Sequence, residues 1–447
     1  MALSGIQIYK LLPQTNCKEC GFPTCLAFAM KLAAKQVELA ACPYVTESSK
    51  TQLAESAAPP IRLVTLKAGN FEVKAGNEVV LFRHDKTFYN KPGLFIRIYD
   101  DQPVEEIKAK VKTADAYAVN YVGMDLTLDG FGIASRAGNP QAFAAAVSAV
   151  RSVSARPLIL MSRDPAIMAA GLQALSNETP LIYGAEASNL DAFAELAKQY
   201  KAPLGVLAPD LNSLADLTEK LKTQGLEDFV LDPGGRDLGS GLSLGTQIRR
   251  LSVKKNFRSL GFPVIAFPGD AAEPGMEAVA AAQALAKYAG FIVLDTFTPA
   301  LAYVLLVLRQ NIYTDPQKPI QVQPGIYEIN APKPTDPVLV TTNFSITYFS
   351  VANEVEGSGL PAWLLVTDAE GMSVLTAWAA GKFDAERIAK AVKTFNIADK
   401  VSRKRLVLPG HVAVLSGELE AELPDWEIRV GPREAVDLPG FMKKVLQ

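Results

Sequence analysis

Between about residues 60 and 315 the chain alternates short apolar runs with alanine-rich stretches of helical character, and this alternation limits the possible folds more than any other feature. Strands that alternate with helices form βαβ units and a parallel sheet. Eight such units in about 250 residues predict a closed (β/α)8 TIM-type barrel, with an open doubly wound sheet as the alternative. The runs are residues 78–82, 116–121, 157–161, 180–184, 203–207, 229–233, 264–268 and 291–295, and a ninth run, 94–100, has no place in this scheme.

Two segments of different character flank this region. Residues 1–59 hold every cysteine of the chain and end in the small, proline-containing stretch ESAAPP, which is typical of a linker. Residues 316–337 are rich in proline, which favours an extended connection. Residues 338–447 contain the runs VLVTT, AWLLVTD, VAVLS and WEIRV together with two helix-like stretches, which predict a small α/β domain with a mostly parallel sheet. We therefore expect a cysteine module with its linker (1–59), a barrel (60–315), a second linker (316–337) and a C-terminal domain (338–447).

Composition excludes several classes of function. The chain carries 45 basic and 47 acidic residues, and it has no basic stripe of the kind that binds nucleic acid. The longest apolar run, residues 300–308, is too short to cross a bilayer. The N-terminus lacks the charged region and apolar run of a signal peptide. We expect a cytoplasmic protein that binds neither nucleic acid nor membrane.

The four cysteines form the pattern C-x2-C-x4-C-x16-C-P, at Cys17, Cys20, Cys25 and Cys42. A reducing cytosol disfavours two disulfides, so the cluster points to a metal centre. Structural zinc sites usually pair two C-x2-C knuckles, whereas here the fourth cysteine is single and distant. The spacing favours an iron-sulfur cluster over zinc, which remains the alternative.

The distance between the third and fourth cysteines limits the path of the chain. A straight helix over the 16 residues between Cys25 and Cys42 would separate them by about 24 Å. We therefore expect the helix that begins near Leu26 to end near Lys35, so that the segment VELAA can bring Cys42 back.

The barrel-like segment offers polar groups at the ends of its runs, where barrel enzymes place catalytic residues. Polar strand ends are normal in any such fold, and His84 has no partner at a metal-binding spacing. The turn DPGG (232–235) is weakly similar to pterin-binding barrels, but a glycine turn capped by its aspartate explains it better. The candidates are His84, Asp85, Asn120, Arg163, Asp164, Glu186, Asp210, Asp232, Asp270 and Asp295.

In the C-terminal segment two strand ends stand out, because ligands of open α/β sheets bind beyond the carboxyl ends of strands. One is VTTNFSITYF (340–349), where hydroxyl side chains alternate with aromatic ones. The other is TDAEGMSVLTAW (367–378), where Gly371 precedes a helix start whose free N–H groups can hold an anion or an amide. An ordinary strand-turn-helix with Ser373 as the N-terminal cap is the competing interpretation.

The stretches NCKECGFPTCLAFAMKLA, ACPY, TTNFSITYF, TDAEGMSVLTAWAAGKF and PGHVAVLSGELE occur in this order along the chain. Together they resemble the large (gamma) subunit family of the corrinoid iron-sulfur protein of the reductive acetyl-CoA (Wood-Ljungdahl) pathway. The resemblance covers all three segments. It implies that the four cysteines bind one 4Fe-4S cluster and that the C-terminal segment is a Rossmann-like corrinoid-binding domain.

The resemblance also implies a function and an assembly. The family carries a methyl group on corrinoid cobalt from methyltetrahydrofolate, through a separate methyltransferase, to acetyl-CoA synthase/CO dehydrogenase. The cluster reactivates cobalt that has been oxidised to Co(II). The implied partners are a small barrel subunit in a heterodimer, the methyltransferase, acetyl-CoA synthase/CO dehydrogenase and a reductive activator.

The sequence lacks D-x-H-x-x-G, the motif whose histidine binds cobalt in many corrinoid proteins. The C-terminal segment has one histidine, His411, without that spacing. The resemblance therefore implies a base-off corrinoid without a histidine ligand, held largely by backbone groups, because glycine lets the main chain approach closely. The expected contacts are Thr341, Thr342, Ser345, Gly371, Met372, Ser373, Val374, Gly431 and Pro432.

Two other functions stay open at this point. One is an iron-sulfur electron-transfer subunit without corrinoid. The other is a pterin-dependent barrel methyltransferase with a structural cluster.

Overall fold

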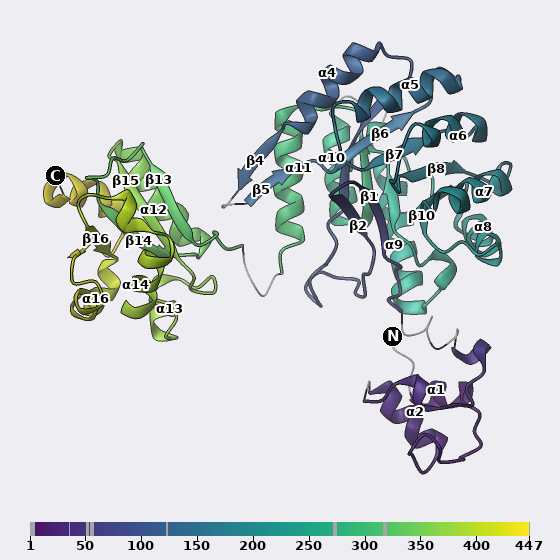
Figure 1. Cartoon of the computed structure of the whole chain (residues 1–447), viewed down its shortest axis with the longest axis horizontal. Coiled ribbons are helices and arrows are strands. Elements are labelled where there is room, and N and C mark those ends of the chain that lie inside the picture. The colour runs from purple at the N-terminus through teal and green to yellow at the C-terminus, as the bar shows by residue number, and fades with distance from the viewer. Residues whose placement is uncertain are drawn as a thin grey trace. The chain divides into compact units, whose positions relative to one another are not determined.

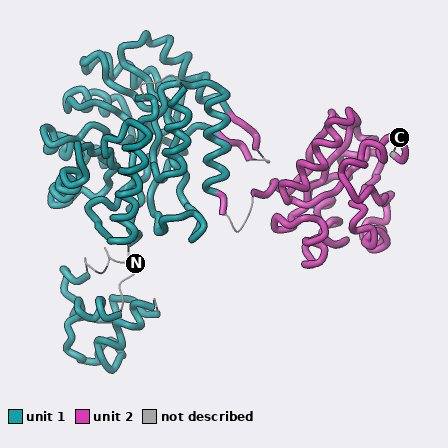
Figure 2. Tube along the Cα trace, turned by 180° about the vertical axis from the view of Figure 1, so that it is seen from behind, with its two compact units in different colours: residues 1–117, 127–313 teal, residues 118–126, 314–447 magenta. Residues whose placement is uncertain are grey.

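The computed structural model describes residues 5–34, 36–50, 53, 58–121, 124–270, 275–315 and 320–446 of the 447-residue chain. Both predicted linkers, as well as Lys35, fall wholly or partly outside these residues. The chain forms two compact units, residues 1–117 with 127–313 and residues 118–126 with 314–447 (Figure 2). No helix among the described residues is both long enough and apolar enough to cross a membrane.

The first unit begins with a small helical module (Figure 1). Its elements are α1 (Gly5–Leu11), α2 (Cys25–Ala33) and the 3-10 turn η1 (Leu39–Ala41). Helices α1 and α2 pack on each other around Phe28 and Ala29, which are almost fully buried. A module of this size buries little apolar surface, so its core needs a further source of stability such as a bound metal.

Eight parallel strands close into a barrel, which confirms the predicted fold of the central segment and excludes the open sheet. Each strand is followed by a helix (Figure 1). The strands are β3 (Gly93–Tyr99), β6 (Gly130–Ala134), β7 (Leu158–Met161), β8 (Leu181–Ala185), β9 (Leu204–Leu207), β10 (Phe229–Asp232), β11 (Val264–Ala266) and β12 (Ala289–Leu294), and the helices are α4 (Val104–Asp115), α5 (Pro140–Arg151), α6 (Pro165–Gln173), α7 (Leu190–Tyr200), α8 (Leu211–Thr223), α9 (Leu238–Lys255), α10 (Met276–Ala286) and α11 (Pro299–Ile312).

Two of the eight predicted barrel strands are wrong. Residues 78–82 form no strand, and Ala118–Tyr121 (β4) pairs only with Met124–Thr127 (β5) in a separate two-stranded sheet. Their places are taken by β3, which contains the ninth run, and by β6, which the sequence did not indicate. Strand β6 reads GFGIA, and glycine weakens a strand signal. The fold nevertheless requires this glycine, since a Cβ on Gly130 would lie 2.2 Å from the Pro157 carbonyl oxygen.

The barrel interior is a packed core that continues into a hairpin. Strands β1 (Val64–Ala68) and β2 (Phe71–Ala75) pair antiparallel, and their buried residues Leu66 and Val73 join the same cluster as Phe95 and Phe291 of the barrel strands. Fully burying a side chain of this kind contributes roughly 1.5–3 kcal/mol. The hairpin therefore belongs to the barrel as a stable element.

The second unit is built on an open five-stranded sheet with the order β13-β15-β14-β16-β17. Strand β13 is antiparallel to β15, and the other strands are parallel. The predicted α/β domain with a mostly parallel sheet is confirmed. The elements are β13 (Gly325–Ile329), β14 (Val338–Thr342), α12 (Ser345–Ser358), β15 (Ala362–Thr367), α13 (Val374–Ala379), α14 (Ala385–Thr394), α15 (Ile397–Lys400), β16 (Arg405–Leu408), η4 (Gly410–Leu415), α16 (Ser416–Glu422), β17 (Glu427–Val430) and α17 (Leu438–Phe441).

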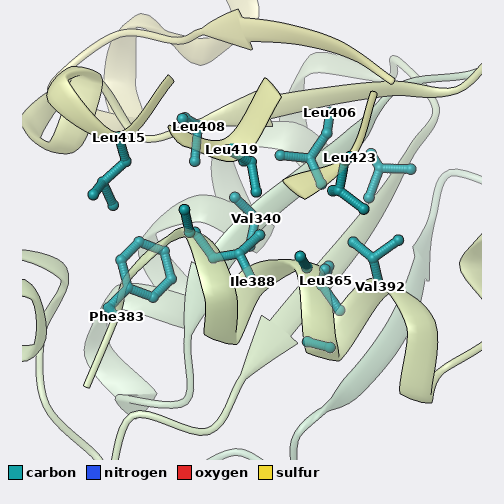
Figure 3. Close-up of a cluster of buried hydrophobic side chains, with 14 of the residues drawn as sticks. Val340, Leu365, Phe383, Ile388, Val392, Leu406, Leu408, Leu415, Leu419 and Leu423 are labelled. Atoms are coloured by element: carbon teal, nitrogen blue, oxygen red, sulfur yellow. The ribbon is translucent and has the colours of Figure 1, made fainter. Parts of the chain in front are cut away.

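Helices cover both faces of this sheet. On one face Val340, Leu365 and Leu406 contact residues of α14 and α16, including Ile388 and Leu419 (Figure 3). On the other face Leu339, Leu364 and Val407 form a second cluster with residues of α12 and α17. Burial on both faces explains why β14 and β15 read as continuous apolar runs.

Three sequence assignments in this unit are corrected. The run VAVLS, predicted as a strand, lies in the 3-10 segment η4 and the start of α16. The inner strand β16, RLVL, was missed because it is only four residues long. Residues 345–349, interpreted as part of an alternating strand end, instead form the first turn of α12.

Candidate cofactor sites

The loop that carries the first cysteines is tightly coiled. Asn16, Lys18 and Gly21 all have positive φ angles of 50°, 67° and 81°. The Asn16 Oδ1 atom accepts a hydrogen bond from the Cys25 backbone N–H (2.8 Å). The loop is thereby tied to the first residue of α2.

The fourth cysteine returns to the same core as the third. Helix α2 ends at Ala33, as the spacing predicted, and η1 leads the chain back to Cys42. Cys25 and Cys42 are both buried in one cluster, and Cys20 packs against its edge. Cys17 is exposed.

Tyr44 provides independent evidence that the two ends of the motif lie near each other. Its hydroxyl donates to Glu19 Oε1 (2.7 Å). This hydrogen bond also raises the pKa of Tyr44. The segment after Cys42 is therefore in direct contact with the loop between Cys17 and Cys20.

Among the residues that the structure describes, no group of three or more His, Cys, Asp or Glu side chains is arranged around a single metal ion. A cubane cluster is larger than one ion and holds its thiolates further apart. A set of four thiolates is the usual ligand set of such a cluster. The donor chemistry and the shared core of Cys25 and Cys42 therefore fit an iron-sulfur cluster.

The second unit contains a pocket of about 300 Å³ at the carboxyl ends of its parallel strands. Along the chain the parallel strands run β14, β15, β16, β17, whereas in the sheet they lie in the order β15, β14, β16, β17. The order therefore reverses between β14 and β16, and such a switch point is where open α/β sheets bind ligands. Residues at the ends of both strands, Thr341 and Leu408, line the pocket.

The structure brings five of the nine predicted contact residues to this pocket. They come from β14, the start of α13 and the segment after β17. The pocket is lined by Thr341, Ser373, Val374, Gly431 and Pro432, whereas Thr342, Ser345, Gly371 and Met372 do not line it.

Two adjacent hydroxyls in β14 have no hydrogen-bond partner. Thr341 and Thr342 are both fully buried, and neither Oγ1 atom is paired. An unpaired buried hydroxyl is costly, so such a group often marks a place where a ligand or water completes the structure. Of the two, only Thr341 lines the pocket, so Thr341 is the candidate for contact with a ligand there.

Sequence analysis missed Asn343, which organises one side of the site. This side chain is almost fully buried, and its Oδ1 accepts from the backbone N–H groups of Ala369 (3.0 Å) and Gly371 (2.9 Å). Its Nδ2 atom donates to Gln321 and Asp368 at 3.2 Å. Asn343 thereby fixes the loop between β15 and α13. Gly371 belongs to this loop and affects the pocket through it, because Gly371 itself does not line the pocket. In the sequence, the indication of this role is an amide side chain directly after an apolar strand.

Backbone segments after β16 and β17 form another wall. The Gly410 N–H donates to the Pro432 carbonyl (2.9 Å), and the Gly431 N–H donates to the Leu408 carbonyl (2.8 Å). A Cβ on Gly410 would lie 2.6 Å from the Gly431 carbonyl oxygen, so this approach requires glycine. His411 also lines the pocket, with its Nε2 atom 3.7 Å from Glu434 Oε1.

The polar residues at the barrel mouth pair with one another. Arg97 binds Asp295 and Asp270, the latter at 2.5 Å. Arg236 binds Asp232 (2.6 Å) and Asp270 (3.1 Å). Burial lowers the pKa of Arg97, but its two carboxylate partners more than offset this and leave it raised. The mouth is therefore a network of ion pairs in which two guanidinium groups share three carboxylates.

The other barrel candidates have structural roles or lie apart. Asp164 and Asp210 cap α6 and α8. Asp232 Oδ1 accepts from the Gly234 N–H (2.9 Å), which confirms the glycine turn with an aspartate cap. The remaining candidates are not gathered at one site: His84 lies 3.5 Å from Asp85, Asn120 lies in β4 and Arg163 lies 3.8 Å from Glu186.

A cysteine module, a closed (β/α)8 barrel and an α/β domain with a pocket at its switch point define a multidomain cofactor protein. The CO dehydrogenase/acetyl-CoA synthase delta subunit family model matches residues 63–442, and a model whose description names an Fe-S cluster matches residues 12–44. The chain belongs to the family of the corrinoid/iron-sulfur protein large subunit.

Two curated relatives show the extent of the match. The chain is 44% identical to the corrinoid/iron-sulfur protein large subunit of Moorella thermoacetica, over 99% of both chains. It is 36% identical to the acetyl-CoA decarbonylase/synthase complex subunit gamma of Methanopyrus kandleri, over 99% of this chain and 98% of that one. Among solved structures, dihydropteroate synthase from Thermus thermophilus matches 50% of this chain and 98% of its own at 14% identity, and its TM-score of 0.38 is too low to support an argument.

Proposed function

We propose that the chain is a methyl carrier of the acetyl-CoA pathway. It carries a methyl group from methyltetrahydrofolate, through a separate methyltransferase, to acetyl-CoA synthase. The observation that supports this most is the pocket at the switch point of the C-terminal sheet, in a chain 44% identical over its length to a corrinoid/iron-sulfur protein.

The pocket is the proposed corrinoid site, in a domain of Rossmann-like type. A bound corrinoid supplies a cobalt atom that accepts and releases a methyl group. The chain supplies a buried, unpaired hydroxyl at Thr341 and closely spaced backbone at Gly410 and Gly431, which suit the amide-bearing rim of such a ring. The cofactor provides the reactivity, and these residues provide binding and orientation.

The cysteine module is the proposed electron source. We propose that Cys17, Cys20, Cys25 and Cys42 bind one 4Fe-4S cluster, whose reducing electrons restore oxidised Co(II). The buried positions of Cys25 and Cys42 favour a stable cluster, and the exposed Cys17 leaves one edge accessible to a redox partner. The proposed partners are the small subunit in a heterodimer, the methyltransferase, acetyl-CoA synthase/CO dehydrogenase and a reductive activator.

The proposed function is tested by methyl transfer with the anaerobically purified heterodimer. Methyltetrahydrofolate and the methyltransferase should convert the reduced cobalt spectrum to that of methyl-cobalt, and acetyl-CoA synthase should reverse the change. A protein that contains iron but no cobalt, and shows only the broad cluster absorption, would be an electron-transfer subunit instead.

The pterin-dependent methyltransferase remains the second alternative. The barrel mouth argues against it because both of its guanidinium groups, those of Arg97 and Arg236, are already paired with carboxylates. Turnover of a pterin substrate without cobalt would establish this alternative.

The unpaired hydroxyls of β14 lead to a paired prediction. Thr341→Val removes a buried hydroxyl without a protein partner, so it should leave the free energy of unfolding of the cofactor-free protein unchanged or raise it by about 1–2 kcal/mol. Corrinoid affinity should fall roughly tenfold as a ligand hydrogen bond is lost. Thr342→Val is the matched control and should keep full affinity, because Thr342 lies outside the pocket. Equal affinities for both variants would remove Thr341 from the site.

His411 leads to a prediction about the lower face of the corrinoid. It lines the pocket, but the sequence around it lacks the cobalt-binding motif. His411→Ala should therefore leave the Co(II) EPR spectrum unchanged, with no nitrogen hyperfine splitting from a protein ligand in either protein. Loss of such a splitting in the variant would show that cobalt is histidine-bound, and the base-off proposal would be wrong.

A further inference from the structure

A pocket of about 270 Å³ lies at the floor of the barrel, at the end opposite to the ion-pair network of the mouth. Its walls come from the segment before β3, from the end of α10 before β12 and from the end of α11. Strands β3 and β12 are neighbours, so the segments that precede their amino ends meet on one side of the barrel. Barrel enzymes place their active sites at the opposite, carboxyl ends of the strands, so the fold alone does not account for this floor pocket.

The floor pocket combines aromatic rings with basic side chains. Among the residues that the structure describes, no carboxylate lines it. The aromatic and basic lining residues are Phe82, Phe88, Tyr288, Arg83, His84 and Lys287. Such a lining is complementary to a flat ring that carries a negative charge.

Two of these rings stack on each other at the rim of the pocket. The Phe82 and His84 rings are nearly parallel, with an angle of 7° between their planes and 5.4 Å between their centroids. Phe82 is 43% exposed and the His84 side chain is 79% exposed. Exposed stacked rings offer an outer face on which a further flat ring can stack.

Tyr288, on another wall, has a strained backbone. Its φ angle is 108°, in the region that favours glycine, directly after the residue that ends α10. A bulky side chain persists in such a conformation only where its surroundings hold it, and ligand sites are a common place for such strain. The Tyr288 ring is held by two cations, with the Arg249 guanidinium 4.9 Å and the Lys287 Nζ atom 5.6 Å from its centroid.

Arg249 supports the aromatic walls from behind. It is 4% exposed and lies 5.2 Å from the centroid of Phe88 as well as against Tyr288. Its Nη2 atom is 3.5 Å from Glu78 Oε2, and neither atom has a hydrogen-bond partner among the described residues. Both side chains line a second cavity of about 30 Å³, which has room for an ordered water. A buried ion pair adds little net stability, so its place behind both rings indicates that it positions them.

We propose that the floor pocket binds a small aromatic anion, with its ring stacked at Phe82 and His84 and its charged group on Lys287. An aromatic carboxylate and a mononucleotide share this chemistry. The pocket is slightly smaller than the roughly 300–1,000 Å³ typical of sites for drug-sized ligands, so the ligand is small. The site lies within the first compact unit, so the inference does not depend on the proposed methyl-carrier function.

The test is titration calorimetry on the purified full chain with its cofactors in place. The probes are indole-3-carboxylate and adenosine monophosphate, each compared with its neutral counterpart, indole or adenosine. At least one anion should bind with a Kd of about 1 mM or tighter, and its neutral counterpart roughly tenfold more weakly, because a charge-assisted contact is lost. The anion that binds more tightly identifies the source as an aromatic carboxylate or a mononucleotide.

Variants locate the binding at the floor pocket. Phe82→Ala should weaken it roughly fivefold through lost stacking, and Lys287→Ala roughly tenfold through the lost charge. Both side chains are exposed, so the barrel should fold normally. Phe257→Ala and Lys254→Ala are the matched controls: both residues are exposed, lie outside the pocket and should leave the affinity unchanged. Absence of binding by both anions at millimolar concentration, equal binding of the neutral counterparts, or unchanged affinity in Phe82→Ala and Lys287→Ala would each overturn the inference.

Discussion

Replacing Cys42 with alanine should remove the iron-sulfur cluster from the anaerobically purified protein. Iron should fall from about four atoms per chain to near zero, and the EPR signal of the reduced cluster should disappear. Cys42 reaches the core that contains Cys25 only because α2 ends at Ala33 and η1 returns the chain. With three thiolates left, the module loses both a ligand and a buried side chain.

The activity of the Cys42→Ala variant should show that the cluster is needed for reactivation and not for methyl transfer itself. The variant should still bind corrinoid and accept methyl groups after chemical reduction, because the pocket lies in the other compact unit. It should lose reactivation by protein reductants. Ala41→Ser, which adds a hydroxyl at the exposed neighbouring position, is the control and should keep its iron. Wild-type protein with one zinc atom and no iron would contradict the proposal.

The sequence was sufficient for the module and the barrel because both carry local signals. The cysteine spacing predicted the end of α2, and parallel strands buried on both sides gave the apolar runs that identified the barrel. The strand predictions failed where contacts between segments distant in sequence decide whether a residue lies in a strand. Strand β6 contains two glycines, and Gly132 packs so closely that a Cβ would lie 2.9 Å from Met161. No property of residues 78–82 shows that the Glu78 carboxylate instead binds the Tyr89 N–H (2.9 Å).

The residues of the pocket were also predicted only in part, because local sequence patterns reveal some of them and not others. Thr341 stands near the end of an apolar run, and Gly431 follows a strand in which apolar and charged residues alternate, so both positions can be recognised from the sequence. Asn343 and Gly410 act through contacts with segments distant in sequence, which no local pattern reveals. The apolar run RLVL is too short to be distinguished from a turn, so the switch point between β14 and β16 could not be located from the sequence.

Gly410 is the position where a single methyl group should do the most harm to the pocket. A Cβ there would lie 2.6 Å from the Gly431 carbonyl oxygen and 2.7 Å from the Pro432 carbonyl carbon. These are backbone atoms, which cannot move aside as a flexible side chain can. At Gly371, by contrast, the nearest atoms belong to the Gln321 side chain, and the cost comes mainly from its positive φ of 72°.

Gly410→Ala should therefore force the segments after β16 and β17 apart. We expect a loss of about 1–3 kcal/mol in the free energy of unfolding, as for other overpacked sites. Corrinoid affinity should fall at least roughly tenfold, because both displaced segments line the pocket. Gly417→Ala in α16 is the matched control, since nothing lies within 4 Å of its Cβ. That variant should gain up to about 1 kcal/mol from helix propensity and bind normally. Normal corrinoid binding by Gly410→Ala would show that the ring does not depend on this wall, and the proposed site would have to move toward α12 and α13.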